Sequence, residues 1–172
     1  SRGMARRDFK FPKADTPPTL VIIAFPINFD NHPYVEKGVR VKTLPDIRWP
    51  RRDIKTTLLF PQSWTKQIAI DEGYDEAWMV DSEGMVTEGT SCNAWILTKD
   101  NKLLTRPVSC DILKGITRTA IEKICAENDI TIVEQAFSAD EAYEAKEAFV
   151  SSATGFALPV IEIDDHKIGD GK

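Results

Sequence analysis

The stretch Asp46-Ile-Arg-Trp-Pro-Arg-Arg-Asp-Ile-Lys-Thr-Thr-Leu-Leu59 joins two segments of different character. Before it, residues 38–44 form an apolar run that is typical of a strand. After it, residues 62–73 carry apolar side chains at helical spacing and end at Gly73, a favoured residue at the end of a helix. The stretch is therefore predicted to connect a strand to a helix, with one lysine, Lys55, near its centre.

A lysine acts as a nucleophile only where its surroundings favour the neutral amine over the ammonium ion. Around Lys55, the apolar Ile54 and Leu58 could bury the amine, and Arg51–Arg52 add positive charge. Both effects favour the neutral form. These neighbours alone do not single out Lys55, and Lys114 is a rival for the same role.

Two further stretches follow along the chain. Val86-Thr-Glu-Gly-Thr-Ser-Cys-Asn93 surrounds Glu88 with a glycine and hydroxyl side chains, and Ile112-Leu-Lys-Gly-Ile-Thr-Arg118 leads into a helix expected over residues 117–128. Taken alone, the first stretch fits a polar turn between two strands with a solvent-facing glutamate. The second fits an ordinary helix start with Thr117 as its N-cap.

In this order, the three stretches resemble the cofactor site of the class IV (fold type IV) pyridoxal-phosphate aminotransferases, most closely that of the D-amino-acid aminotransferases. Arg48-Trp49 and Asp53-Ile-Lys55 match the pattern around the Schiff-base lysine of that family. The resemblance implies pyridoxal 5′-phosphate as cofactor and Lys55 as the catalytic residue, which holds the cofactor covalently and later shuttles a proton. The family often has an asparagine soon after this lysine, whereas this chain has Thr56-Thr-Leu.

The resemblance assigns the two ends of the cofactor to the other stretches. Glu88 would keep the pyridine nitrogen protonated, which allows the ring to accept electrons. Ile116 and Thr117 would bind the phosphate, because the free N–H groups and the dipole at a helix start attract an anion. Lys114 stands where a phosphate counter-charge or a surface residue would lie.

A fourth segment, Ser151-Ser-Ala-Thr-Gly155, follows a strand expected around Phe149–Val150. Its small residues would let the backbone approach the phosphate, so the resemblance makes Ser152 and Ala153 cofactor-binding residues. Many relatives have threonine in place of Ala153, and that contact would pass to Ser152 or Thr154. The same residues also fit a plain serine- and glycine-containing loop.

The basic N-terminal segment, residues 1–9, resembles the part of D-amino-acid aminotransferases that traps the substrate carboxylate with an arginine and a histidine. Arg7 aligns with the arginine, and its guanidinium suits a carboxylate. Phe9 stands in place of the histidine. In the family this segment reaches the partner subunit's site, which implies a homodimer. A solvated basic edge is the alternative for these arginines.

Strand-like and helix-like segments alternate without a regular βαβ repeat, so we expect an α+β fold, that of the large domain of a fold type IV enzyme. Further strands are expected at 20–25, 76–80 and 94–97, with a pair of strands over 159–168 joined by an Asp-Asp turn, and another helix at 138–145 that opens with a capping box. The four tryptophans occupy core-like positions.

The resemblance also predicts the domain organisation. Residues 1–25 would be the last piece of a small domain, 26–33 the interdomain connection, and 34–172 the large cofactor-binding domain without its last helix. We therefore expect the sequence to be a fragment.

Composition excludes other classes of protein. With 42% hydrophobic and 28% charged residues, the composition is typical of a globular protein. The net charge is −5, from 22 basic and 27 acidic residues that form no long blocks, and this does not favour nucleic acid as a partner. Three cysteines without metal-like pairing favour reduced thiols over disulfides. Neither a membrane span nor a signal peptide is recognisable, so a cytoplasmic protein is expected. His32 and His166 lie in connecting segments and are not expected to be catalytic.

The predicted function is transamination between an amino acid and a 2-oxo acid, of the D-amino-acid or branched-chain kind. Aminodeoxychorismate lyases and (R)-selective amine transaminases share the fold and are alternatives. A third hypothesis, of a different class, is an inactive cofactor-binding or oligomerising fragment.

Overall fold

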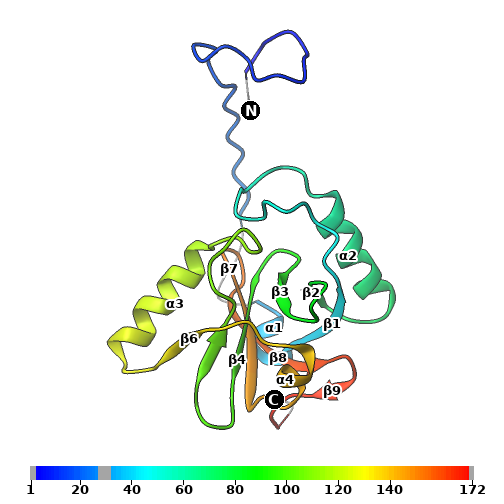
Figure 1. The fold of residues 1–172 in the computed structure, drawn as a ribbon, viewed down its shortest axis with the longest axis vertical. Coiled ribbons are helices and arrows are strands. Elements are labelled where there is room, and N and C mark those ends of the chain that lie inside the picture. Colours follow the sequence, from blue (N-terminus) through cyan, green and yellow to red (C-terminus); the bar gives the residue numbers. More distant parts are fainter. Residues whose placement is uncertain (1–2, 27–31, 171–172) are drawn as a thin grey trace.

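The computed structural model describes residues 3–26 and 32–170 (Figure 1). In these ranges the chain forms four helices and nine strands. In chain order they are α1 (Tyr34–Lys37), β1 (Val39–Pro45), α2 (Phe60–Asp71), β2 (Glu76–Val80), β3 (Val86–Gly89), β4 (Asn93–Leu97), β5 (Leu103–Thr105), α3 (Ile116–Glu127), β6 (Ile132–Glu134), α4 (Ala139–Tyr143), β7 (Glu147–Ser152), β8 (Phe156–Ile163) and β9 (His166–Lys167).

The strands form one mixed sheet in the order β3-β2-β1-β8-β7-β4-β5-β6, with β9 paired to β8. β1 is parallel to both β2 and β8, whereas β4, β7 and β8 pair antiparallel. The sheet must curl strongly. In a flat sheet β3 and β4 would lie about 24 Å apart, yet only residues 90–92 join them, which span about 14 Å at most. The curl brings Glu88 on β3 close to Asn93 on β4.

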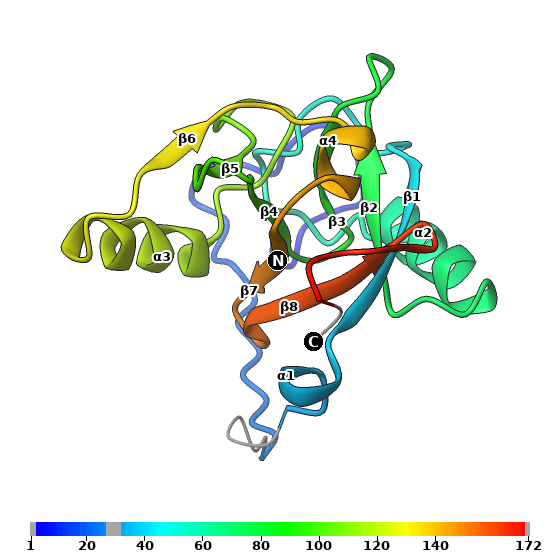
Figure 2. The same cartoon turned by 90° about the horizontal axis from the view of Figure 1, so that it is seen from below.

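The main core lies within this curved sheet. Trp78 on β2 is fully buried and packs edge-on against Phe137, and β2, β3 and β5 are buried along nearly their whole length. Two helices flank the sheet at opposite sides (Figure 2). α2 packs through Ala69 against Tyr74 and Ala77, and α3 packs through Cys125 against the strands β4 and β5.

Most predicted elements are found where the sequence placed them. The strand at 76–80 has the expected bounds, and Asp164-Asp165 turns between β8 and β9 with both φ angles positive. The capping box of α4 is formed by Ser138 and Glu141. The α2 helix begins two residues earlier than predicted, at Phe60, and Gly73 follows its end with a positive φ.

The strand predicted at residues 20–25 is wrong. Residues 3–26, called here the arm, form no strand and extend away from the sheet (Figure 1). Leu20 and Ile22 are about 80% exposed. A strand needs a neighbour for its backbone hydrogen bonds, and the described residues supply none for the arm.

Two of the four tryptophans also differ from their predicted core positions. Trp78 and Trp95 are fully buried, but Trp49 and Trp64 are 39% and 54% exposed. Trp49 lies within the segment 46–59, here called the lysine connection, which joins β1 to α2, and Trp64 lies on α2. Most of the predicted interdomain connection, at 27–31, lies outside the described residues, as do 1–2 and 171–172. No described helix combines the length and apolar composition of a membrane span.

Candidate active site

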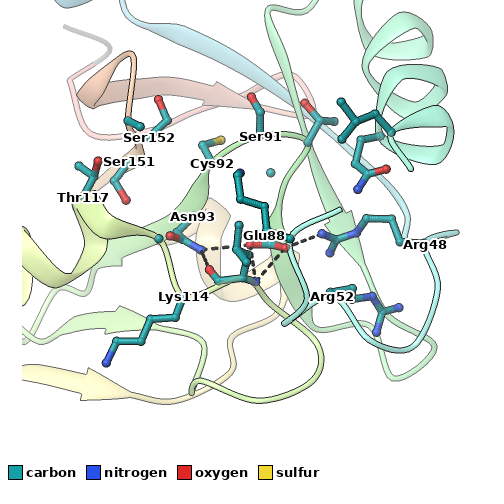
Figure 3. Close-up of a pocket in the computed structure, with 18 of the residues that line it drawn as sticks. Arg48, Arg52, Glu88, Ser91, Cys92, Asn93, Lys114, Thr117, Ser151 and Ser152 are labelled. Atoms are coloured by element: carbon teal, nitrogen blue, oxygen red, sulfur yellow. Dashed lines mark hydrogen bonds and ion pairs between the residues drawn. The ribbon is translucent and has the colours of Figure 1, made fainter. Parts of the chain in front are cut away.

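One cavity of about 650 Å³ lies where the lysine connection, the β3–β4 turn, the start of α3 and the end of β7 meet. Six of the seven site residues predicted from the sequence line it: Lys55, Glu88, Ile116, Thr117, Ser152 and Ala153. Segments that are far apart in the chain therefore meet at one site (Figure 3). The seventh, Arg7, does not line it; this exposed residue lies on the arm.

Glu88 is the most firmly held of these residues. Its side chain is 7% exposed and forms an ion pair with Arg48. The Asn93 amide donates to Glu88 Oε2 over 3.1 Å, and the backbone N–H of Leu113 donates to both carboxylate oxygens, over 3.2 and 3.1 Å (Figure 3). Three separate segments thus fix one carboxylate, and the solvent-facing turn considered above does not describe it.

Burial raises the pKa of Glu88 above its ordinary value, because a carboxylate loses hydration there. The charge of Arg48 and the hydrogen bonds from Arg48 and Leu113 act in the opposite direction and favour the ionised form. The structure therefore places a carboxylate with a raised pKa in the wall of a cavity, where it can face a positively charged ligand group.

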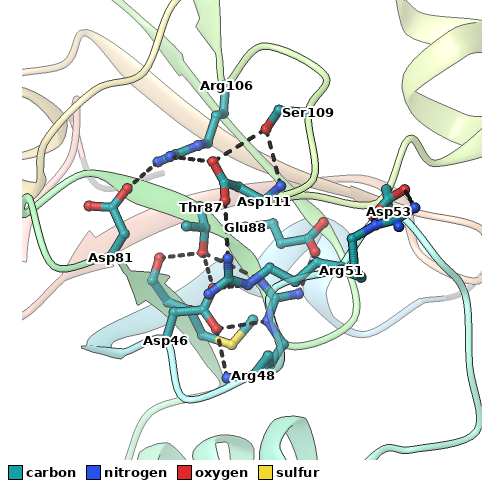
Figure 4. A network of polar contacts seen from close by, with 12 residues as sticks. Asp46, Arg48, Arg51, Asp53, Asp81, Thr87, Glu88, Arg106, Ser109 and Asp111 are labelled. Atoms are coloured by element: carbon teal, nitrogen blue, oxygen red, sulfur yellow. Dashed lines mark hydrogen bonds and ion pairs between the residues drawn. The ribbon is translucent and has the colours of Figure 1, made fainter.

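The Arg48 guanidinium is held in turn by two hydrogen bonds to Asp46. Its Nε donates to Asp46 Oδ1 over 3.0 Å and its Nη2 to Asp46 Oδ2 over 2.7 Å. The hydroxyl of Thr87 lies 2.8 Å from Asp46 Oδ2 and accepts from Arg48 Nη2 over 3.3 Å. A network of buried polar side chains thereby joins the lysine connection to β3 (Figure 4).

Asn93 links the two ends of the cavity. Besides binding Glu88, its amide donates to the carbonyl of Leu113 over 2.9 Å. A Cβ on Gly115 would come within 2.8 Å of Asn93 Oδ1. Gly115 therefore allows the start of α3 to approach β4 this closely.

The start of α3 carries no side-chain cap. Gly115 is the N-cap residue, so the Thr117 N-cap considered from the sequence is wrong, and the helix begins at Ile116. The first N–H groups of a helix have no partners within it and attract anions. Ile116 and Thr117 thus present an anion-binding feature to the cavity.

The end of β7 forms the neighbouring wall. Ser151 is buried, lies opposite Asn93 in the sheet and accepts a hydrogen bond from Trp95 Nε1 over 2.9 Å. Ser152 Oγ accepts from the backbone N–H of Gly155 over 3.0 Å, which closes the loop as a tight turn. In Figure 3 the side chains of Ser151, Ser152 and Thr117 gather on one side of the cavity.

Lys55 lies at the exposed rim of the cavity, and its side chain forms no hydrogen bond or ion pair with any residue that the structure describes. The connection just before Lys55 is fixed by Arg52. Arg52 N–H donates to the carbonyl of Cys110 over 2.9 Å, and the Arg52 side chain pairs with Asp111 over 3.1 Å. The rival, Lys114, is exposed and extends away from Glu88 in Figure 3.

Sequence reasoning assigned no role to Arg48 or Asn93. Both stand within the stretches that carried the resemblance, but their contacts with Glu88 depend on how the sheet curls. The only local signal for Arg48 is an aspartate two residues before it, which suits an arginine fork.

Comparison with known proteins identifies the family. The sequence model of the amino-transferase class IV family matches residues 1–163. The chain belongs to this family. A D-alanine aminotransferase of Staphylococcus haemolyticus is 38% identical over 174 residues, covering 100% of this chain and 60% of that protein. One from Bacillus licheniformis is 37% identical, with 99% of this chain and 59% of the relative covered.

Solved structures show the same fold. A branched-chain aminotransferase of Thermoproteus uzoniensis superposes with a TM-score of 0.73 at 30% identity, covering 81% of this chain and 48% of that one. For the branched-chain enzyme of Escherichia coli the TM-score is 0.75 at 26% identity, with 86% and 50% covered. The α+β, fold type IV prediction is confirmed. The chain spans about 60% of the length of the curated relatives it matches.

Proposed function

We propose that this protein catalyses pyridoxal-phosphate-dependent transamination between an amino acid and a 2-oxo acid. The observation that carries the proposal is one cavity with a buried, fixed carboxylate in one wall, an uncapped helix start in another, and Lys55 at the rim. The D-alanine aminotransferases among its relatives support the reaction class.

The residues present fit pyridoxal phosphate. Glu88 would pair with the protonated pyridine nitrogen, Ile116 and Thr117 would donate to the phosphate, and Ser152 and Ala153 would lie beside it. One branched-chain aminotransferase with the same fold has been solved in complex with N-(5′-phosphopyridoxyl)-L-glutamate. When bound, the cofactor supplies an electron sink for the carbanion that transamination requires.

The remaining chemistry belongs to the chain's own residues. Lys55 would hold the cofactor covalently and, once released by the substrate amine, would carry the proton from the substrate Cα. Among the described residues Lys55 has no fixed partner, which suits a group that must move between these two tasks. Glu88 would keep its charge and position throughout.

Arg7 is proposed to bind the substrate carboxylate from a second copy of the chain, so the active protein would be a homodimer. The arm extends away from the sheet (Figure 1) and Arg7 does not line the cavity of its own chain, which supports action on a partner. We also propose the division into a small-domain piece at 1–25 and a large domain at 34–172. Phe9 in place of a histidine would leave the carboxylate to Arg7 alone on this segment.

A spectroscopic assay tests the function. Protein reconstituted with pyridoxal phosphate should be yellow, and an amino donor should bleach the band while a 2-oxo acid restores it. We expect D-alanine to act as donor, with L-leucine as the branched-chain comparison. Lys123→Ala, at an exposed position on α3 that does not line the cavity, should behave as wild type and serves as the matched control. A band that no amino acid bleaches would support the inactive cofactor-binding hypothesis instead.

A further inference from the structure

The contact between Arg48 and Glu88 has a geometry that ordinary surface ion pairs lack. The side chains of Asp46, Arg48 and Glu88 are 0%, 5% and 7% exposed. Charges this far from water interact strongly, and losing one partner leaves the other uncompensated. A pair of this kind has a large effect on the charge and position of its members.

The guanidinium of Arg48 is oriented before it meets Glu88. It is planar with donors in fixed directions, and two of its nitrogens, Nε and Nη2, are bound to Asp46. The remaining nitrogen, Nη1, donates to Glu88 Oε1. Because the Asp46 fork fixes the plane, Nη1 can point only toward the Glu88 carboxylate.

We propose that Arg48 is the positioning residue of this site: it holds Glu88 ionised and aimed into the cavity. The inference rests on the proposed function, in which Glu88 meets the pyridine nitrogen. Arg48 precedes Lys55 by seven positions in the same connection, so one segment supplies both the reactive amine and the counter-charge of the carboxylate.

The other groups around Glu88 do not replace Arg48. The charged groups with the largest influence on Glu88 are Arg48 and Asp46 from the lysine connection. The Cys92 thiol from the β3–β4 turn interacts with it more weakly, and Arg52 pairs with Asp46 and Asp111. Asp46 is negative and opposes ionisation of Glu88. Asn93 and the Leu113 N–H are neutral donors. Arg48 is thus the positive charge that meets the carboxylate directly.

Carbon-13 NMR of glutamate-labelled protein without cofactor tests the proposal, because the carboxyl shift of Glu88 reports its protonation. Glu88→Gln identifies the signal. Arg48→Met should raise the titration midpoint of Glu88 by about one pH unit or more. Arg48→Lys keeps a positive charge, so its midpoint should lie close to that of wild type. Arg51→Met is the matched control: this exposed arginine pairs with Asp53, and its loss should leave the midpoint unchanged.

An unchanged Glu88 midpoint in folded Arg48→Met would overturn the proposal. If that variant does not fold, a measurement on the wild-type protein tests the proposal instead. The nitrogen-15 chemical shifts of the Arg48 side chain are followed as Glu88 titrates. Shifts that change with the same midpoint as Glu88 support the proposal, and shifts that stay constant through that pH range overturn it. A separate result bears on the proposed function: if Glu88→Gln leaves the absorbance of bound pyridoxal phosphate unchanged, the pyridine contact fails while the role of Arg48 toward Glu88 stands.

Discussion

The two polar ends of the cavity are built in opposite ways. At the Glu88 end, Arg48, Asn93 and the Leu113 N–H bind one buried carboxylate from three segments. At the Lys55 end, an exposed amine has no hydrogen bond or ion pair to the described chain. The difference matches the two tasks proposed for them. A charge that must stay in place is fixed before the ligand arrives, whereas an amine that must bind, leave and carry a proton is kept free.

The largest effect should come from removing the free end. Lys55→Ala should lower transamination by about 10³-fold or more, because covalent attachment and proton transfer are lost together. The fold should be unaffected, since Lys55 holds nothing within the described structure. Steady-state assays with D-alanine measure this, with Lys123→Ala, outside the cavity lining, as control. Turnover near that of wild type in Lys55→Ala would contradict the catalytic role proposed for Lys55.

At the fixed end, Glu88→Gln should lower turnover by about 10²-fold or more, since a pyridine nitrogen without its carboxylate is a poorer electron sink. The amide keeps the shape of the side chain but leaves the buried Arg48 without one of its two carboxylate partners, so the variant should fold with a lowered melting temperature. Glu83→Gln, at an exposed turn, is the control. If Glu88→Gln retains near-normal turnover, the fixed carboxylate serves only the fold.

The contact that joins Asn93, at the Glu88 end, to the start of α3 can be altered through Gly115→Ala. The added Cβ would meet Asn93 Oδ1 at 2.8 Å and push the start of α3 away from β4. We expect affinity for pyridoxal phosphate to fall by about tenfold, as for a loss of about 1.4 kcal/mol. Gly84→Ala should instead cost stability without changing the affinity, because Gly84 has φ +81° with open space around it and does not line the cavity. Equal affinity in both variants would contradict a role for this contact.

The smallest expected effect concerns acid stability. Burial alone would raise the pKa of Asp46, but the hydrogen bonds and charge of Arg48 outweigh burial and hold it below the ordinary 3.8. A lowered pKa stabilises the fold above the unfolded-state pKa, and this stabilisation is lost as the pH falls through the folded-state value. Asp46→Asn should therefore be less stable at pH 7 but lose less stability below about pH 4. Urea unfolding across pH measures both, and parallel pH profiles for the two proteins would contradict the prediction.

The sequence could predict features that depend on neighbouring residues but not contacts that depend on how distant segments meet. Strands such as β2 and the Asp164-Asp165 turn follow from local patterns, because the residues themselves carry the preference. The arm was mispredicted because apolar composition alone does not provide a neighbouring strand. Six of the site residues that line the cavity could be predicted because each belongs to a short motif that is recognisable in the sequence. The contacts of Arg48 and Asn93 were not predictable, since they depend on a curl that brings β3 against β4 and the lysine connection against both.

The most direct test of the account is to identify which lysine binds the cofactor. Protein loaded with pyridoxal phosphate is reduced with borohydride, digested, and the modified peptide is sequenced by mass spectrometry. We predict the modification on Lys55, the free amine at the rim of the cavity. A modification on Lys114 or Lys66 with Lys55 untouched would contradict the assignment of the two ends and the proposed mechanism with it.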